Sequence, residues 1–148
     1  MGTLSKGSPR RQKIVQPNLL AYNEQFDNAA WSKQNSMSAL GQNLTFVTAN
    51  SYVQYTNAIT GYTVGQSFLL RAVLVATATT TVTLILIDAA DGVPSYTQAV
   101  AVSTTPVSTS FPVTMGAGFS GNLTVQLHGA NVITAGTVVT VGNLTLTA

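Results

Sequence analysis

The sequence predicts an all-β protein, a jelly-roll-like antiparallel β-sandwich preceded by an extended N-terminal arm. From residue 34 onward, short segments rich in Val, Thr and aromatic residues recur at spacings of about ten residues. Gly, Pro, Asp and Asn, the residues favoured in turns, separate these segments. No segment after residue 34 keeps a helical hydrophobic period over three turns of helix. Several short strands joined by turns are therefore expected, and a jelly roll is one such all-β arrangement.

Composition indicates one folded domain that associates with other protein surfaces. The chain has 148 residues, which is enough for a single hydrophobic core. Apolar residues make up 45% of it and charged residues only 7%, against about 25% charged residues in an average globular domain. Because few charges keep copies apart, we expect a homo-oligomer, either a dimer or a trimer.

The positive charge is concentrated at the N-terminus, in residues 1–17. Four of the six Lys and Arg residues lie there: Lys6, Arg10, Arg11 and Lys13. Gly and Pro interrupt this stretch and it shows no strand or helix period, so we interpret it as an extended basic arm. Such an arm suits an acidic protein surface, nucleic acid or an anionic membrane, and the alternative is a solvated tail with no dedicated partner.

The sandwich domain is expected over residues 18–148, and its first part is the least regular. Residues 18–22 are a candidate short apolar strand, and residues 23–28 are rich in turn formers. Phe26 and Trp31 are interpreted as an aromatic plug that closes one end of the sandwich, because large rings bury a large area. The alternative for Trp31 is an exposed platform on which a sugar stacks.

Nine further strands are predicted from β-forming composition and alternation. The segment at 81–87 alternates at first and then becomes continuously apolar, which is typical of a central strand. The nine strands are expected at residues 34–40, 43–48, 51–57, 66–76, 81–87, 96–102, 108–115, 122–128 and 137–147.

The opening of this domain, NLLAYNEQFDNAAW at residues 18–31, resembles the start of β-sandwich domains in tailed-phage virion proteins. Those domains are tail-fibre, head-fibre and capsid-decoration modules, and their shape is related to that of carbohydrate-binding modules. Residues 61–72, a turn followed by a long strand, and residues 136–146, a closing strand, resemble elements of carbohydrate-binding-module jelly rolls.

The resemblance implies a structural virion protein, most specifically a capsid decoration (cement) protein on the capsid exterior. Its partner would be the major capsid protein, and each copy would stabilise the shell by bridging capsomers. Lys6, Arg10, Arg11 and Lys13 would then supply charge for contacts with the capsid or a neighbouring subunit. The alternative is a glycan-binding head-fibre or tail-fibre adhesin module, with Tyr52, Tyr55 and Tyr62 as the candidate sugar-facing residues.

Residues suited to catalysis or to metal binding are scarce, so neither an enzyme nor a cofactor is expected. His128 is the single histidine, which excludes a multi-histidine metal site within one chain, and there is no cysteine. Glu24 and Asp27 lie near a turn, where capping or solvation is expected. Asp88 and Asp91 precede Gly92, a pattern that fits either an ordinary turn or a small calcium loop.

Two further classes of partner are disfavoured by sequence pattern. Residues 116–121 spell GxGxxG but lie between predicted strands with no following helix, so we expect a hairpin loop and no phosphate site. The aromatic residues of the domain are not interleaved with Lys or Arg, so no specific nucleic-acid site is expected. The longest apolar stretches, 68–76 and 82–87, fall far short of the roughly 18 residues that a membrane span requires.

Overall fold

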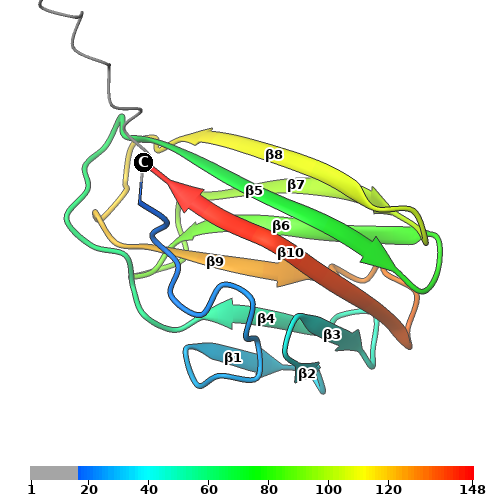
Figure 1. Cartoon of the computed structure of the whole chain (residues 1–148). Helices are drawn as coiled ribbons and strands as arrows, with labels where there is room; N and C mark the ends of the chain where they lie inside the picture. The colour runs from blue at the N-terminus through cyan, green and yellow to red at the C-terminus, as the bar shows by residue number, and fades with distance from the viewer. Residues whose placement is uncertain (1–16) are drawn as a thin grey trace, which may run out of the picture.

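Ten antiparallel strands form the part of the chain that the computed structural model describes, residues 17–148, and no helix occurs among these residues (Figure 1). The predicted all-β sandwich is therefore confirmed. The proposed arm contacts Lys6, Arg10, Arg11 and Lys13 lie outside the described residues. The strands are β1 Trp31–Gln34, β2 Ser38–Leu40, β3 Asn43–Phe46, β4 Tyr52–Tyr55, β5 Ser67–Ala76, β6 Thr80–Asp88, β7 Ser95–Val102, β8 Val107–Thr114, β9 Leu123–His128 and β10 Thr137–Thr147.

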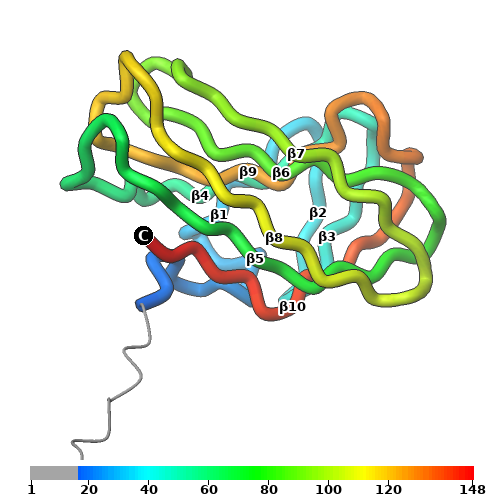
Figure 2. Tube along the Cα trace, turned by 90° about the horizontal axis from the view of Figure 1, so that it is seen from above, coloured from blue at the N-terminus to red at the C-terminus, as the bar shows by residue number. Residues whose placement is uncertain are grey.

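The strands form two five-stranded sheets that pack face to face (Figure 2). The first sheet has the strand order β1-β4-β9-β6-β7, and the second has the order β2-β3-β10-β5-β8. The C-terminal strand β10 lies at the centre of the second sheet, between β3 and β5. Within residues 17–148, no helix is long and apolar enough to cross a membrane.

Alternation along the strands creates the core between the sheets. In β5, the side chains of Phe68, Leu70, Ala72, Leu74 and Ala76 are buried, and the intervening side chains point outward. The strands β6, β9 and β10 contribute buried Leu and Val side chains in the same way. Full burial of one Leu or Val side chain stabilises the fold by about 1.5–3 kcal/mol, so the paired inner faces supply the main driving force for folding.

The predicted strand at 34–40 is wrong in one respect, because the structure divides this segment between the two sheets. β1 ends at Gln34, β2 begins at Ser38, and a turn separates them. Asn35 and Ser36 adopt left-handed backbone conformations, with φ of 51° and 64°. Asn tolerates this region better than most residues, so the Asn-Ser pair reverses the chain and delivers β2 to the opposite sheet.

The candidate strand at 18–22 is also not a regular strand, although it occupies a strand-like position. It lies beside the C-terminal half of β10, beyond the residues of β10 that pair with β3 (Figure 1). The Leu19 N–H donates to the carbonyl of Leu146 at 2.8 Å, and the side chain of Asn18 bonds both Leu144 and Leu146. Side-chain bonds replace the regular ladder, and Tyr22, with φ of 52°, turns the chain away.

Candidate functional site

The two residues of the predicted aromatic plug lie in the core. Phe26 is 0% exposed and Trp31 is 1% exposed. Their rings meet edge to face, with centroids 4.9 Å apart, and the indole N–H of Trp31 donates to the carbonyl of Tyr22 at 3.0 Å. A sugar cannot stack on a ring that solvent does not reach. Trp31 is therefore not a sugar platform in this structure.

Tyr55 was a candidate sugar-facing residue, and the structure contradicts that assignment. Its side chain is 4% exposed, its ring lies 5.1 Å from the ring of Trp31, and its hydroxyl accepts a hydrogen bond from the N–H of Ala21. The physical reason is strand parity, since side chains three residues apart in a strand point to opposite faces. If Tyr52 faces outward on β4, Tyr55 must face the core.

Tyr62 lies in the loop between β4 and β5, away from Tyr52. Its ring is half-buried and packs edge-on against Phe68 at 4.8 Å, and its backbone N–H bonds the carbonyl of Gly121. Gly121 precedes β9, whereas Tyr52 pairs with His128 at the end of β9. Because six strand residues span about 20 Å, Tyr62 and Tyr52 lie too far apart to share one small sugar.

The outer face of the first sheet places polar and aromatic side chains in neighbouring rows. The rings of Tyr52 and His128 stack with centroids 4.5 Å apart and planes 8° apart. In the next row, the amide nitrogen of Gln126 donates to the amide oxygen of Gln54 at 2.9 Å. Six outward side chains on β1, β4 and β9 form what we call the Tyr52 face: Ser32, Gln34, Tyr52, Gln54, Gln126 and His128.

His128 carries no charge on this face near neutral pH. Partial burial lowers the pKa of its imidazole below the ordinary value of 6.5. Its Nδ1 accepts a hydrogen bond from the N–H of Ala130 at 2.7 Å, so the neutral ring carries its proton on Nε2. The Tyr52 face therefore presents hydroxyl, amide and imidazole groups without a formal charge.

The segment containing Asp88 and Asp91 forms a hydrogen-bonded turn. The buried Asp88 carboxylate accepts bonds from the N–H and hydroxyl of Ser120 and from the N–H of Ala90, while Asp91 accepts from Val93. The bond from the Ser120 backbone, together with the others, holds the pKa of Asp88 below its ordinary value of 3.8, against the opposing effect of burial. Within residues 17–148, no group of three or more His, Cys, Asp or Glu side chains is arranged to hold a metal ion.

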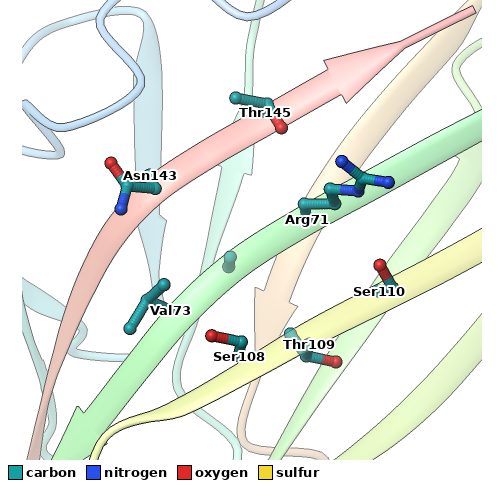
Figure 3. Close-up of a pocket in the computed structure, with 8 residues that line it drawn as sticks. Arg71, Val73, Ser108, Thr109, Ser110, Asn143 and Thr145 are labelled. Carbon is teal, nitrogen blue, oxygen red and sulfur yellow. The ribbon is translucent and has the colours of Figure 1, made fainter.

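The outer face of the second sheet holds a groove with a volume of about 420 Å³ (Figure 3). Strands β5, β8 and β10 line it, and no aromatic or acidic side chain contributes to the lining. Its residues are Arg71, Ala72, Val73, Ser108, Thr109, Ser110, Asn143 and Thr145. The two outer faces thus differ in chemistry, because the first is aromatic and neutral and the second contains a cation among hydroxyls.

Comparison with solved structures shows a likeness in fold to carbohydrate-binding modules. A family 61 module in complex with β-1,4-galactotriose is 10% identical, with a TM-score of 0.57, and the match covers 88% of this chain and 97% of that one. The N-terminal cellulose-binding domain of Cellulomonas fimi β-1,4-glucanase C is 14% identical, with a TM-score of 0.56, covering 80% and 88%.

A phage protein shares the fold as well. The enzymatically active domain of bacteriophage CBA120 tailspike protein 4 is 16% identical, with a TM-score of 0.63, and the match covers 88% of this chain but only 21% of that one. At these identities the likeness concerns the fold alone. No protein-family model and no curated protein sequence matches the chain.

Sequence reasoning names Tyr52 as a candidate but does not name its neighbours on this face. Parity along β4 places Tyr52 and Gln54 on one face, and this much can be read from the sequence. The pairing of β4 with β9, which adds His128 and Gln126, joins residues more than 70 positions apart and has no local signal. The groove around Arg71 was also missed, because its lining residues come from three strands.

Proposed function

We propose that this protein is a glycan-binding module and that the Tyr52 face contacts the sugar. The observation that carries the proposal is a carbohydrate-binding-module fold together with a partly exposed tyrosine that lies beside a hydrogen-bonded pair of glutamine side chains. The comparisons support the fold, and the sugar contact is our inference from the side chains.

The chemistry of the Tyr52 face fits a neutral saccharide. The C–H surface of a pyranose packs against an aromatic ring, and the Tyr52 ring is held in place by its stack on His128. Gln54 and Gln126 use one bond on each other, and their remaining amide groups donate to and accept from sugar hydroxyls. The face has no pair of carboxylates of the kind that glycoside hydrolysis requires, so we propose binding without catalysis.

Sugar binding by the purified chain tests this proposal. The probes are β-1,4-galactotriose, soluble cello-oligosaccharides and a broad glycan array. Calorimetry then measures the affinity of each glycan that binds. We expect Tyr52→Ala to weaken binding at least tenfold, which corresponds to about 1.4 kcal/mol. Tyr22→Ala is the matched control, because Tyr22 is 51% exposed and lies outside the Tyr52 face, and it should change affinity less than twofold.

Two outcomes would contradict the proposal. If a folded Tyr52→Ala variant binds sugar as tightly as the parent chain, the Tyr52 face is not the site. If no glycan on the array binds, the proposed function is wrong. Gln126→Ala provides a second variant if Tyr52→Ala fails to fold, since it removes one amide of the Gln54–Gln126 pair and leaves the Tyr52 ring in place.

A structural role in a phage virion is the second candidate function. The opening at residues 18–31 and the likeness in fold to a phage tailspike domain favour it. In this proposal the chain is a decoration protein on the capsid exterior, with the major capsid protein as its partner and self-association into a dimer or trimer. Lys6, Arg10, Arg11 and Lys13 would make the charged contacts. This role requires a fixed ratio of copies to shell subunits.

A further inference from the structure

An irregularity in β10 shapes the groove on the second sheet. The register between β10 and β5 shifts between Gly142 and Thr145, and Asn143 takes a left-handed conformation with φ of 50°. Gly142 pairs with Val73 and follows the buried Val141, so its missing side chain would have pointed outward over Val73. Asn143 and Thr145, at this irregularity of β10, both line the groove, as does Val73 opposite Gly142.

Arg71 places a positive charge at this groove. It pairs with Ser110 of β8 on one side and with Thr145 of β10 on the other, and Figure 3 shows its side chain between these two strands. The side chain of Arg71 is exposed, and none of the groove residues is an acid that could neutralise it. Within residues 17–148, the other cation is Lys33, which lies on β1 of the opposite sheet and donates to the carbonyl of Trp31.

The groups around Arg71 favour an anion that also carries hydroxyls. A guanidinium presents two parallel N–H donors that match the two oxygens of a carboxylate. Ser108, Ser110, Thr145 and Asn143 surround it with groups that both donate and accept, as sugar hydroxyls require. The volume of about 420 Å³ lies within the usual range of roughly 300–1,000 Å³ for small-ligand sites.

We propose that this Arg71 groove binds the carboxylate of an acidic saccharide, such as a uronic acid residue within a glycan chain. The choice of a saccharide rests on the proposed function, whereas the choice of a carboxylate rests on Arg71 and its neighbours. The groove lies on the opposite sheet from the Tyr52 face, so one glycan-binding module would hold two sites of different chemistry.

Calorimetry with a galacturonic acid trimer and its fully methyl-esterified form tests the proposal on the full chain. We expect the trimer to bind and the ester to bind at least tenfold more weakly. Arg71→Gln should produce a similar loss for the trimer, and Arg71→Lys should lose part of the affinity because an ammonium lacks the two-pronged geometry. Lys33→Gln removes the same charge elsewhere and should change the affinity less than twofold.

Gly142→Val tests the shape of the groove independently of charge. A Cβ at Gly142 meets nothing closer than the carbonyl oxygen of Val73 at 3.9 Å, so the backbone there has room for a side chain, and we expect the valine methyl groups to occupy space beside Val73, which lines the groove. We expect it to weaken binding of the trimer as strongly as Arg71→Gln does. Thermal unfolding of each variant confirms that a loss of binding is not a loss of fold.

The outcomes separate this proposal from the proposed function. If Arg71→Gln binds the trimer as tightly as the parent chain, or if Tyr52→Ala alone abolishes that binding, the Arg71 groove is not the site. If neutral glycans bind through Tyr52 and the trimer does not bind, the groove proposal is wrong and the proposed function stands. Equal binding of a sulfated trimer would overturn the carboxylate assignment, and the absence of any glycan binding would overturn both proposals.

Discussion

Individual polar side chains attach the opening segment of the domain to its last strand. Asn18 and Asn23 both donate to the carbonyl of Leu144, at 3.0 and 2.8 Å. Oε1 of Glu24 accepts from the N–H of Asn143 at 2.9 Å, where the bulge interrupts the ladder of β10. The distinctive residues of the opening therefore serve as backbone partners and core rings, so their structural role is sufficient to explain the motif.

Asp88 leads to a prediction about stability and pH. Its folded-state pKa lies below 3.8, mainly because the Ser120 backbone N–H bonds the ionised carboxylate, so the folded state binds this proton less readily than the unfolded chain does. The resulting stabilisation is present above pH of about 4 and is lost as pH falls through the folded pKa. We expect Asp88→Asn to lower the Tm at pH 7 and to reduce the acid-induced fall in Tm, as measured by circular dichroism.

Asp91→Asn is the matched control for that measurement. Asp91 is exposed, and within residues 17–148 its carboxylate accepts one hydrogen bond, from the N–H of Val93. Its substitution should leave the pH profile of the Tm close to that of the parent chain. Identical profiles for Asp88→Asn and the parent would show that the Ser120 contacts do not stabilise the fold.

At the scale of elements, close packing between the end of β9 and the loop before β4 depends on Gly129. A Cβ built at this position lies 2.3 Å from the carbonyl oxygen of Ala49 and 2.6 Å from Cγ2 of Ile133. Backbone atoms cannot move aside cheaply, so we expect Gly129→Ala to destabilise the fold by about 1–3 kcal/mol. The free energy of unfolding in urea measures this effect.

Gly142→Ala is the control for Gly129→Ala, because both replace a glycine that lies outside the left-handed region. The nearest atom to a Cβ at Gly142 is 3.9 Å away, which is ordinary van der Waals contact. We expect its unfolding free energy to stay within about 0.5 kcal/mol of the parent value. A similar loss in both variants would mean that general glycine-to-alanine effects, and not the clash with Ala49, cause the destabilisation.

The strands were largely predictable from the sequence because each long strand has one buried face. β5, β7 and β10 begin and end within one residue of the predicted bounds, since alternation and flanking Gly or Pro mark them clearly. The split between β1 and β2 was not predicted, although Asn35 and Ser36 are residue types favoured in turns and Asn tolerates the left-handed conformation that it adopts here.

The candidate sites were less predictable than the strands that carry them. The alternation of buried and exposed residues predicts which side chains share a face of one strand, but long-range packing sets the order of strands within a sheet. The stacking of Tyr52 on His128 and the alignment of Arg71 with Thr145 both depend on that order. The burial of Tyr55 was within reach of sequence reasoning, since its spacing from Tyr52 places the two rings on opposite faces.

At the scale of the whole molecule, the domain has two chemically distinct outer faces and very little charge. Residues 18–148 contain two Lys or Arg residues and four Asp or Glu residues, a formal charge of −2, while residues 1–17 contain four Lys or Arg residues and no Asp or Glu. In the proposed functions, this charge distribution would let residues 1–17 contact one partner and the sheet faces another. The glycan-binding and virion roles are therefore compatible.

Copy number in purified particles distinguishes a capsid decoration protein from a fibre or tail module. A decoration protein binds equivalent positions on a symmetric shell, so its copies stand in a simple ratio to the major capsid protein. Each contact of standard size buries roughly 1,600 Å² in total, and repetition over the shell multiplies the stabilisation.

For a decoration protein, quantitative mass spectrometry should find hundreds of copies per particle, and Gln substitutions at Lys6, Arg10, Arg11 and Lys13 should weaken attachment to purified shells. A handful to a few dozen copies would instead fit a fibre or tail module that binds host glycans through its sheet faces. Absence from particles would exclude both virion roles and leave glycan binding to be judged on its own.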